Sequence, residues 1–261
     1  MAYHAQFIRP DGATLIVVGD TTLDAIKPAV EKAFGEWTAT TPRKTLSVST
    51  VTSPKPKVLL IDKPGAEQSF IVAGNIFGAR KDNDPIAAEA MNQIIGGSFM
   101  SRINMNLRED KHWSYGSRSF LFDTRNQQVY AVYAQVQSDK TKESILEVQK
   151  ELNGYLSTNP ATEEELARVK SNTARKIPGQ NETTGRLLNS VEEIVVFGLP
   201  DDYYNTYVER VESLDTATVA AAAKTIIQPQ NMVWIVVGDL SKIEAGVREL
   251  NLAADVEVIQ Q

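Results

Sequence analysis

The segment GGSFMSRINMNLREDKHWSY, from Gly96 to Tyr115, is the most informative part of the sequence about the fold. Apolar residues at helical spacing over residues 84–95 lead into its two glycines, a pattern typical of a helix end. A second helix is predicted over residues 100–109, and a strand from residue 114 onward. A phosphate-binding loop is the weaker interpretation of Gly96-Gly97, because the pair follows a helix and has no Gly-Lys-Ser/Thr continuation. We therefore expect a close-packed turn at these glycines.

On both sides of residues 96–115, strands and helices follow one another in a mixed order. Strands are expected over residues 58–62 and 68–74, with Pro64-Gly65 as the turn of a hairpin between them. Two further strands are expected over residues 114–122 and 129–136 because of their β-rich or alternating composition.

Helical patterns fill most of the remaining sequence, and one more strand follows them. The predicted helices cover residues 84–95, 140–156, 163–175, 183–197, 203–211 and 216–227, before a strand over residues 233–237. This order predicts an α+β fold, a two-layer sandwich of a mostly antiparallel sheet packed on helices.

One supersecondary unit occurs twice in the chain. Residues 7–20, FIRPDGATLIVVGD, align without gaps to residues 226–239, IIQPQNMVWIVVGD, and seven of the fourteen positions are identical. Each copy predicts a Pro-containing turn, a buried β-branched strand and a Gly-Asp break before an amphipathic helix. Val-Val-Gly-Asp alone is common, but Pro10 and Pro229 match at the same offset, which argues against chance similarity. The copies lie 219 residues apart, so a repeat of that length would place one copy at the end of each of two units.

Composition excludes several classes of protein. The chain is 42% apolar, enough for a large core, and no apolar run reaches the roughly 18 residues that a membrane-spanning helix needs. A net charge of −6 with scattered Lys and Arg disfavours a nucleic-acid partner. The absence of cysteine excludes disulfides and thiolate metal sites, and it suits a bacterial cytoplasmic or periplasmic protein equally well.

Residues 96–115 closely resemble the corresponding segment of the second, non-metal half of M16 zinc peptidases, the pitrilysin and mitochondrial-processing-peptidase group. The match lies in Gly-Gly-Ser-Phe-Met-Ser-Arg, in Leu-Arg-Glu-Asp-Lys and in Tyr-Gly. It departs from the family at Ile103, where Leu is usual, and at the bulky Trp113.

This resemblance implies a domain organisation as well as a fold. M16 proteins resemble two units of similar fold in tandem, of the type shared with LuxS-like metallohydrolases, and each unit closes with the repeated strand and helix. Residues 1–38 then correspond to the tail (strand and helix) of a preceding unit. Residues 39–56, rich in Thr, Ser, Lys and Pro, correspond to a linker, and residues 57–261 to a complete second, inactive unit.

The metal-binding motif of the family is missing from this sequence. M16 catalysis uses His-x-x-Glu-His on a helix, with two His ligands and a Glu general base. His4 is followed by Ala-Gln-Phe-Ile and His112 by Trp-Ser-Tyr-Gly, so neither histidine can build this motif. The chain also lacks a Gly-x-Ser-x-Gly nucleophile elbow. We expect no catalytic and no metal-ligating residue here, and by resemblance the zinc belongs to a metal-bearing half.

Arg108 and Tyr115 are the candidate substrate-binding residues. A guanidinium and a phenol are hydrogen-bond donors that can hold a peptide carbonyl and stabilise the oxyanion formed when it is attacked. Spacing alone favours a structural role, in which Arg108 pairs with Glu109 or Asp110 on a solvated helix end and Tyr115 fills a strand position. The surrounding resemblance favours the functional role, since this pair contacts the substrate in family members.

Together these features imply the C-terminal, non-catalytic part of a bacterial M16-type zinc metalloendopeptidase, inactive on its own. Its partners would be a peptide or unfolded protein substrate and a metal-bearing half, upstream in the same chain or in a separate subunit. The expected compartment is the periplasm, which the resemblance favours, or the cytoplasm. The alternative is a stand-alone interaction or scaffold subunit that pairs with a separate metal-bearing chain. A retained Arg/Tyr pair argues for the peptidase role, because a scaffold does not need it.

Overall fold

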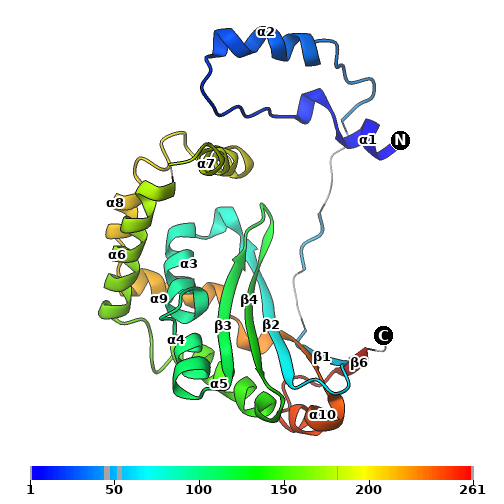
Figure 1. Cartoon of the computed structure of the whole chain (residues 1–261), viewed down its shortest axis with the longest axis vertical. Helices are drawn as coiled ribbons and strands as arrows, with labels where there is room; N and C mark the ends of the chain where they lie inside the picture. The colour runs from blue at the N-terminus through cyan, green and yellow to red at the C-terminus, as the bar shows by residue number, and fades with distance from the viewer. Residues whose placement is uncertain (1, 44–47, 52–54, 181, 260–261) are drawn as a thin grey trace. The chain divides into compact units, whose positions relative to one another are not determined.

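The structure, a computed structural model, describes residues 2–43, 48–51, 55–180 and 182–259 (Figure 1). The chain divides into two compact units. Unit 1 comprises residues 1–49 and 175–206, and unit 2 comprises residues 50–174 and 207–261. Unit 2 holds the sheet and both candidate site residues.

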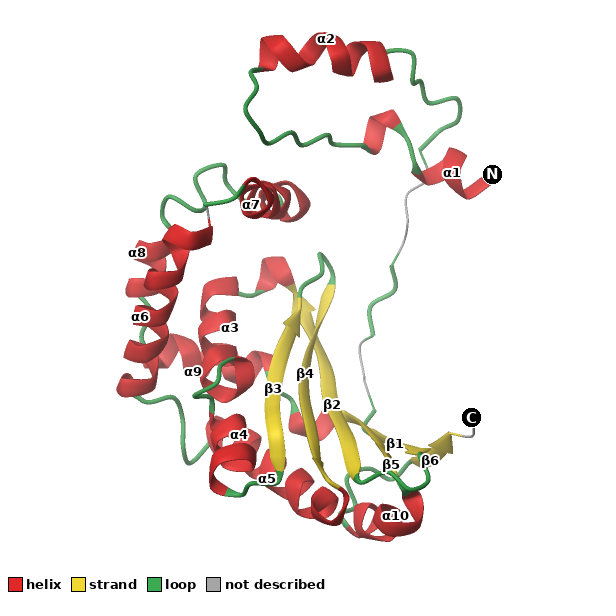
Figure 2. Cartoon of the chain, in the orientation of Figure 1, coloured by secondary structure: helices red, strands yellow, loops and turns green. Residues whose placement is uncertain are grey.

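Unit 2 is built on a six-stranded mixed sheet with the strand order β3-β4-β2-β5-β1-β6 (Figure 2). The antiparallel ladders join β3 to β4, β4 to β2 and β2 to β5, whereas β1 runs parallel to both β5 and β6. Three of the five ladders are therefore antiparallel, and the α+β fold of a sheet packed on helices is confirmed. The strands are β1 (Lys57–Asp62), β2 (Gln68–Ala79), β3 (Ser114–Phe122), β4 (Gln127–Gln137), β5 (Val233–Gly238) and β6 (Val256–Ile259).

One face of this sheet is buried against helices. Leu60, Ile71, Trp234 and Val236 alternate along their strands with more exposed residues, and they belong to one apolar core that also contains helical residues such as Met91. Alternation of this kind places one set of side chains on the helix-covered face and the other on the opposite face. The helices that contribute to this core are α3 (Pro85–Asn92), α4 (Arg102–Asn104), α5 (Thr141–Leu156), α6 (Glu163–Gln180), α8 (Tyr207–Glu212), α9 (Thr216–Ile226) and α10 (Leu240–Glu249).

The opposite face of the sheet is apolar but open in the part of the chain that the structure describes. Phe70 packs edge-on against Tyr133 with ring centroids 4.8 Å apart, and Phe120 lies near Phe122 on the same face. These side chains are half-buried or exposed, unlike their neighbours on the helix-covered face.

The expected hairpin of the first two strands is wrong. Gly65 does adopt a left-handed turn conformation, with φ 74°, but β5 lies between β1 and β2 and pairs with both. The chain therefore leaves β1 and re-enters the sheet two positions away. The physical reason is that the apolar β5 needs ladder partners on both sides to satisfy its buried backbone groups.

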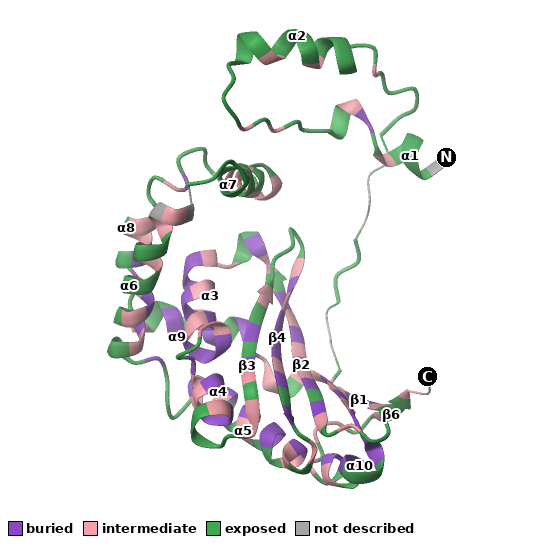
Figure 3. Cartoon of the chain, viewed as in Figure 1, coloured by how far each residue is buried: buried purple, intermediate pink, exposed green. Residues whose placement is uncertain are grey.

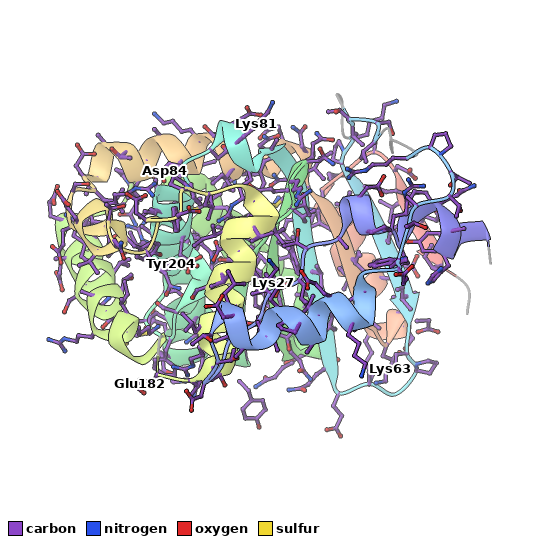
Figure 4. The ribbon with its side chains drawn as sticks, turned by 90° about the horizontal axis from the view of Figure 1, so that it is seen from above. Lys27, Lys63, Lys81, Asp84, Glu182 and Tyr204 are labelled. Atoms are coloured by element: carbon purple, nitrogen blue, oxygen red, sulfur yellow. The ribbon has the colours of Figure 1, made fainter. Side chains whose placement is uncertain are left out.

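Two helices of unit 2 begin at a capping aspartate. Asp84, labelled in Figure 4, accepts a hydrogen bond from the amide of Ile86 at 2.9 Å and starts α3. Asp215 accepts from the amide of Thr218 at 2.7 Å and starts α9. The carboxylates satisfy amides that have no partner within the first turn. One prediction was too long, because α8 begins only at Tyr207 and the preceding residues form turns.

Unit 1 contains α1 (Ala2–Phe7), α2 (Leu23–Phe34) and α7 (Thr184–Phe197). The start of α7 is capped by Thr183, and its end by Gly198 in the left-handed conformation with φ 64°. Helix α6 reaches Gln180, and so continues past the interruption expected at Pro178-Gly179.

The strand expected in the first copy of the repeat is not formed. Both copies begin with a 3-10 turn, Pro10–Gly12 and Pro229–Asn231, and both lead into a helix. Between turn and helix, the second copy is β5, whereas residues 13–18 pair with no strand among the described residues. Helix α2, drawn mostly in the colour of exposed residues in Figure 3, has no buried side chain. The reason is that an extended segment becomes a strand only beside a ladder partner.

Among the described residues, no helix is long and apolar enough to cross a membrane.

Candidate functional site

Arg108 and Tyr115 lie at the two ends of one short connection in unit 2. Residues 100–109, expected to be helical, form helix α4 (Arg102–Asn104) followed by a π-helical turn, η4 (Met105–Asp110), which carries Arg108. Tyr115 is the second residue of β3. The chain folds back between them, because the amide of Trp113 donates to the carbonyl of Leu107 at 3.0 Å.

His112 shapes this connection rather than offering a ligand. Its backbone is in the left-handed region with φ 57°, where residues other than glycine are uncommon. Its Nδ1 lies 3.2 Å from the carbonyl oxygen of Arg108. The exposed imidazole thus contacts the same turn that carries Arg108.

The Arg108 guanidinium is accessible although it has contacts of its own. Its side chain is 40% exposed, and its Nε lies 3.3 Å from a carboxylate oxygen of Glu109. The ion pair considered as the structural alternative is therefore present. Exposed pairs of this kind contribute at most about 1 kcal/mol, so Glu109 does not prevent Arg108 from binding another acceptor.

Tyr115 occupies a β-bulge. Ser114 is paired with Val136 and Gly116 with Gln135, so Tyr115 is an extra residue without a partner position on β4. The Ser114 hydroxyl holds the bulge, since it donates to the carbonyl of Gln135 at 2.7 Å and accepts from the amide of Gly116 at 3.0 Å. The tyrosine side chain is 87% exposed, so it does not fill a packing position on the sheet.

Two glycines bring the helical layer close to β3. A Cβ on Gly96 would lie 2.3 Å from the Ser119 hydroxyl oxygen and 2.6 Å from the Ser119 amide, so no larger residue fits there. A Cβ on Gly97 would lie 2.7 Å from the Asn92 amide nitrogen. The Ser119 hydroxyl itself donates to Asn92 at 2.6 Å. The close-packed turn predicted at Gly96-Gly97 is confirmed, and it fixes the end of α3 against the strand that carries Tyr115.

A largely buried ion pair fixes the start of α4. Arg102 donates to Glu165 through Nε and Nη2 at 2.7 and 2.6 Å, and through Nη2 to the carbonyl of Pro160 at 2.8 Å. Its guanidinium also lies over the Tyr155 ring at 4.9 Å. Burial opposes the charged form of both partners, but their hydrogen bonds and mutual attraction outweigh it. The pKa of Glu165 is therefore lowered and that of Arg102 raised.

Sequence reasoning missed Phe99, which belongs to this site. The Arg108 Cζ lies 4.8 Å from the centroid of the Phe99 ring, in a cation–π contact. The only sequence signal was its place in the same motif, because it lies nine positions before Arg108 and no helical or strand period links the two residues.

Among the described residues, no group of three or more His, Cys, Asp or Glu side chains could hold a metal ion. The described part of the chain thus offers hydrogen-bond donors and an aromatic ring at this site, a set suited to binding an oxygen acceptor such as a peptide carbonyl.

Comparisons with known proteins identify the family and the fold of the chain. Residues 1–173 match the family model described as the peptidase M16 inactive domain. No curated protein matches the chain. Two solved structures share its fold over 91% of its length. One is a peptidase M16 inactive domain from Pseudomonas fluorescens, with a TM-score of 0.80 and 21% identity. The other is a protease from Helicobacter pylori, with a TM-score of 0.79 and 15% identity.

A third similar structure is the periplasmic protease PqqL from Escherichia coli, with a TM-score of 0.68 and 15% identity over 84% of the present chain. The chain spans only part of these proteins, 56% of the first, 57% of the second and 24% of the third.

Proposed function

The chain belongs to the family of M16 peptidase inactive domains, and we propose that it is the non-catalytic part of a bacterial zinc metalloendopeptidase. In this role it binds a peptide or unfolded protein segment and presents it to a metal-bearing half. It is inactive alone, because its sequence has no His-x-x-Glu-His.

The observation that carries the proposal is the exposure of two hydrogen-bond donors at one connection. Arg108 offers several N–H groups and Tyr115 one O–H group, and neither side chain is held in the core. Donors aimed at a carbonyl oxygen stabilise the negative charge that develops there on attack. Zinc in the metal-bearing half would supply the attacking hydroxide, while Arg108 and Tyr115 orient the carbonyl and bind its oxygen.

The open face of the sheet supports a second contribution, the wall of a substrate chamber. β3 carries Tyr115 at one end and Phe120 and Phe122 farther along. Their neighbours across the ladders are apolar as well, with Val129 opposite Phe122 and Ala131 opposite Phe120. A water-exposed apolar sheet face is costly unless it is covered, and an unfolded peptide supplies the apolar groups to cover it.

The first copy of the repeat supports a docking mode for the metal-bearing half. β5, the second copy, lies between an antiparallel and a parallel neighbour. Residues 13–18 carry the same pattern, with Leu15 and Val17 exposed, so they suit the equivalent central position in the sheet of the metal-bearing half. In this proposal residues 1–38 complete that half, residues 39–56 link the two, and residues 57–261 form the inactive unit.

The proposal is tested by peptide hydrolysis with added zinc, using this chain alone, a metal-bearing M16 half alone, and their mixture. We expect activity in the mixture well above that of either component. Arg108→Ala and Tyr115→Phe should each lower kcat by about 100-fold, the usual effect of removing one oxyanion donor. Arg248→Ala is the matched control, because Arg248 is also half-exposed and pairs with a neighbouring carboxylate, that of Glu244.

Three outcomes would contradict this function. Zinc-dependent hydrolysis by the chain alone would mean that it holds a metal site. Equal losses of hydrolytic activity in Arg108→Ala and Arg248→Ala would show that the site has no specific role in hydrolysis. Association with the metal-bearing half without any effect of Arg108 or Tyr115 on hydrolysis would favour the alternative of a scaffold subunit.

A further inference from the structure

Phe99 is an aromatic residue that the core does not use. It lies between the Gly96-Gly97 turn and α4, and 57% of its surface is exposed. Burying a Phe side chain stabilises the folded state by roughly 1.5–3 kcal/mol, and an exposed Phe99 forgoes most of this stabilisation. Its ring instead faces a cation, the Arg108 guanidinium, at 4.8 Å.

The Arg108 guanidinium contacts both the Phe99 ring and the Glu109 carboxylate, and the two contacts differ in whether they leave its N–H groups free. A carboxylate accepts the N–H groups of a guanidinium and so competes with any other acceptor. An aromatic ring attracts the cation through its π face and leaves the N–H groups available. Arg108 can therefore be held by Phe99 and still bind a carbonyl oxygen.

The backbone of Phe99 is fixed to the strand that carries Tyr115. The buried side chain of Asn104 donates through Nδ2 to the carbonyl of Phe99 at 2.7 Å, and its Oδ1 accepts from the amide of Ser117 at 3.1 Å. Ser117 is two residues beyond Tyr115 on β3. One buried amide thus sets the position of the Phe99 loop relative to the Tyr115 strand.

From this geometry we propose that Phe99 is a positioning residue for Arg108. Its ring holds the guanidinium in place for the substrate carbonyl, and Asn104 keeps the ring in register with Tyr115. This inference rests on the proposed function for its effect on hydrolysis, but the Phe99–Arg108 contact can be tested without substrate.

The substrate-free test is the arginine side-chain NMR spectrum of the full chain, with the Arg108 signals assigned from Arg108→Lys. Protons above an aromatic ring are shifted upfield, so we expect upfield Arg108 side-chain signals in the wild type. The shift should disappear in Phe99→Leu, which keeps an apolar side chain, and remain in Phe99→Tyr, which keeps the ring. An unchanged Arg108 spectrum in Phe99→Leu would overturn the inference.

The functional test uses the zinc-loaded mixture of this chain with the metal-bearing half. We expect Phe99→Leu to lower kcat/KM about 3-fold, the effect of one exposed cation–π contact, and Phe99→Tyr to stay close to the wild type. In an Arg108→Ala background, Phe99→Leu should have no further effect, because the group that it positions is gone. The melting temperatures of the Phe99 variants serve as the check on folding.

The two proposals fail in different ways. If Arg108→Ala lowers activity but Phe99→Leu lowers it equally with and without Arg108, the positioning role is wrong and the proposed function stands. If Arg108→Ala has full activity, the proposed function is wrong, and the NMR spectrum alone decides whether Phe99 holds Arg108.

Discussion

The two copies of the repeated segment have the same sequence pattern but different structural surroundings. In residues 226–239 the segment contains β5, whose Trp234 is 2% exposed between two ladder neighbours. In residues 7–20 the matched Leu15 is 58% exposed, and no ladder partner lies among the described residues. The 3-10 turn and the helix form in both copies because they are satisfied by local contacts, whereas the strand needs a neighbour.

The comparison extends to the helices that follow. Ile243 and Val247 of α10 are buried against the sheet, whereas α2 has the same amphipathic character and no fully buried side chain. An apolar helix face gains its stability by packing on another element. In the docking mode proposed above, the partner surface of residues 7–38 belongs to the metal-bearing half.

The largest difference in stability between the two copies is expected when the matched apolar side chain is truncated. We expect Trp234→Ala to lower the free energy of unfolding by about 4 kcal/mol, since it removes a fully buried aromatic side chain from the core. Leu15→Ala should stay within about 0.5 kcal/mol of the wild type. Urea unfolding followed by circular dichroism measures both. Similar losses in the two variants would show that the first copy is packed as the second is.

A smaller effect is expected at the matched glycines that follow each segment. A Cβ on Gly238 would lie 2.7 Å from the Ile243 Cδ1 and 2.7 Å from the Ser69 hydroxyl oxygen, whereas a Cβ on Gly19 meets nothing within 4 Å. We expect Gly238→Ala to cost about 2 kcal/mol from overpacking, and Gly19→Ala to be neutral or slightly stabilising. Thermal unfolding of the two variants measures the difference. A destabilised Gly19→Ala variant would contradict the expectation that Gly19, unlike Gly238, is not closely packed.

The smallest effect is expected at the matched aspartates. Hydrogen bonds from Ser241, Lys242 and the amide of Gly65 outweigh partial burial and lower the pKa of Asp239. A lowered pKa in the folded state gives stability that is present above the unfolded pKa, about 3.9, and is lost as pH falls through the folded value.

Asp239→Asn should therefore lower the unfolding midpoint at pH 7 and remove part of its decline below about pH 4. Asp20→Asn is the matched change, because none of the described residues donates a hydrogen bond to that carboxylate, and we expect an unchanged midpoint at pH 7. Denaturant melts over a pH series test this pair, and an Asp239→Asn curve parallel to the wild type would contradict the prediction.

Much of the fold could be predicted because its signals are local. The helical periods, the helix starts predicted near residues 84 and 183, and the alternation along β3 and β4 depend on residues a few positions apart. The close approach at Gly96 could be predicted as well, since only glycine permits it. The family and the α+β fold followed from the motif and the order of these elements.

The parts that could not be predicted depend on distant contacts. The position of β5 between β1 and β2 is decided by pairs of residues 159 to 176 positions apart, so the turn at Pro64-Gly65 could not reveal it. The four-residue β6 gives too short a pattern to be recognised. At the candidate site, the spacing of Arg108 and Tyr115 was visible in the sequence. The bulge and the Phe99 ring depend on strand register and on three-dimensional proximity.

The β-bulge at Tyr115 also determines which substitutions this position tolerates. Because this residue stands outside the pairing of β3 with β4, the alternation from Gly116 onward is the same whatever side chain occupies position 115. Folding therefore places almost no constraint on the chemistry of this side chain. Position 115 is a place where a binding preference can be altered, by mutation or by engineering, without a change in the protein that carries it.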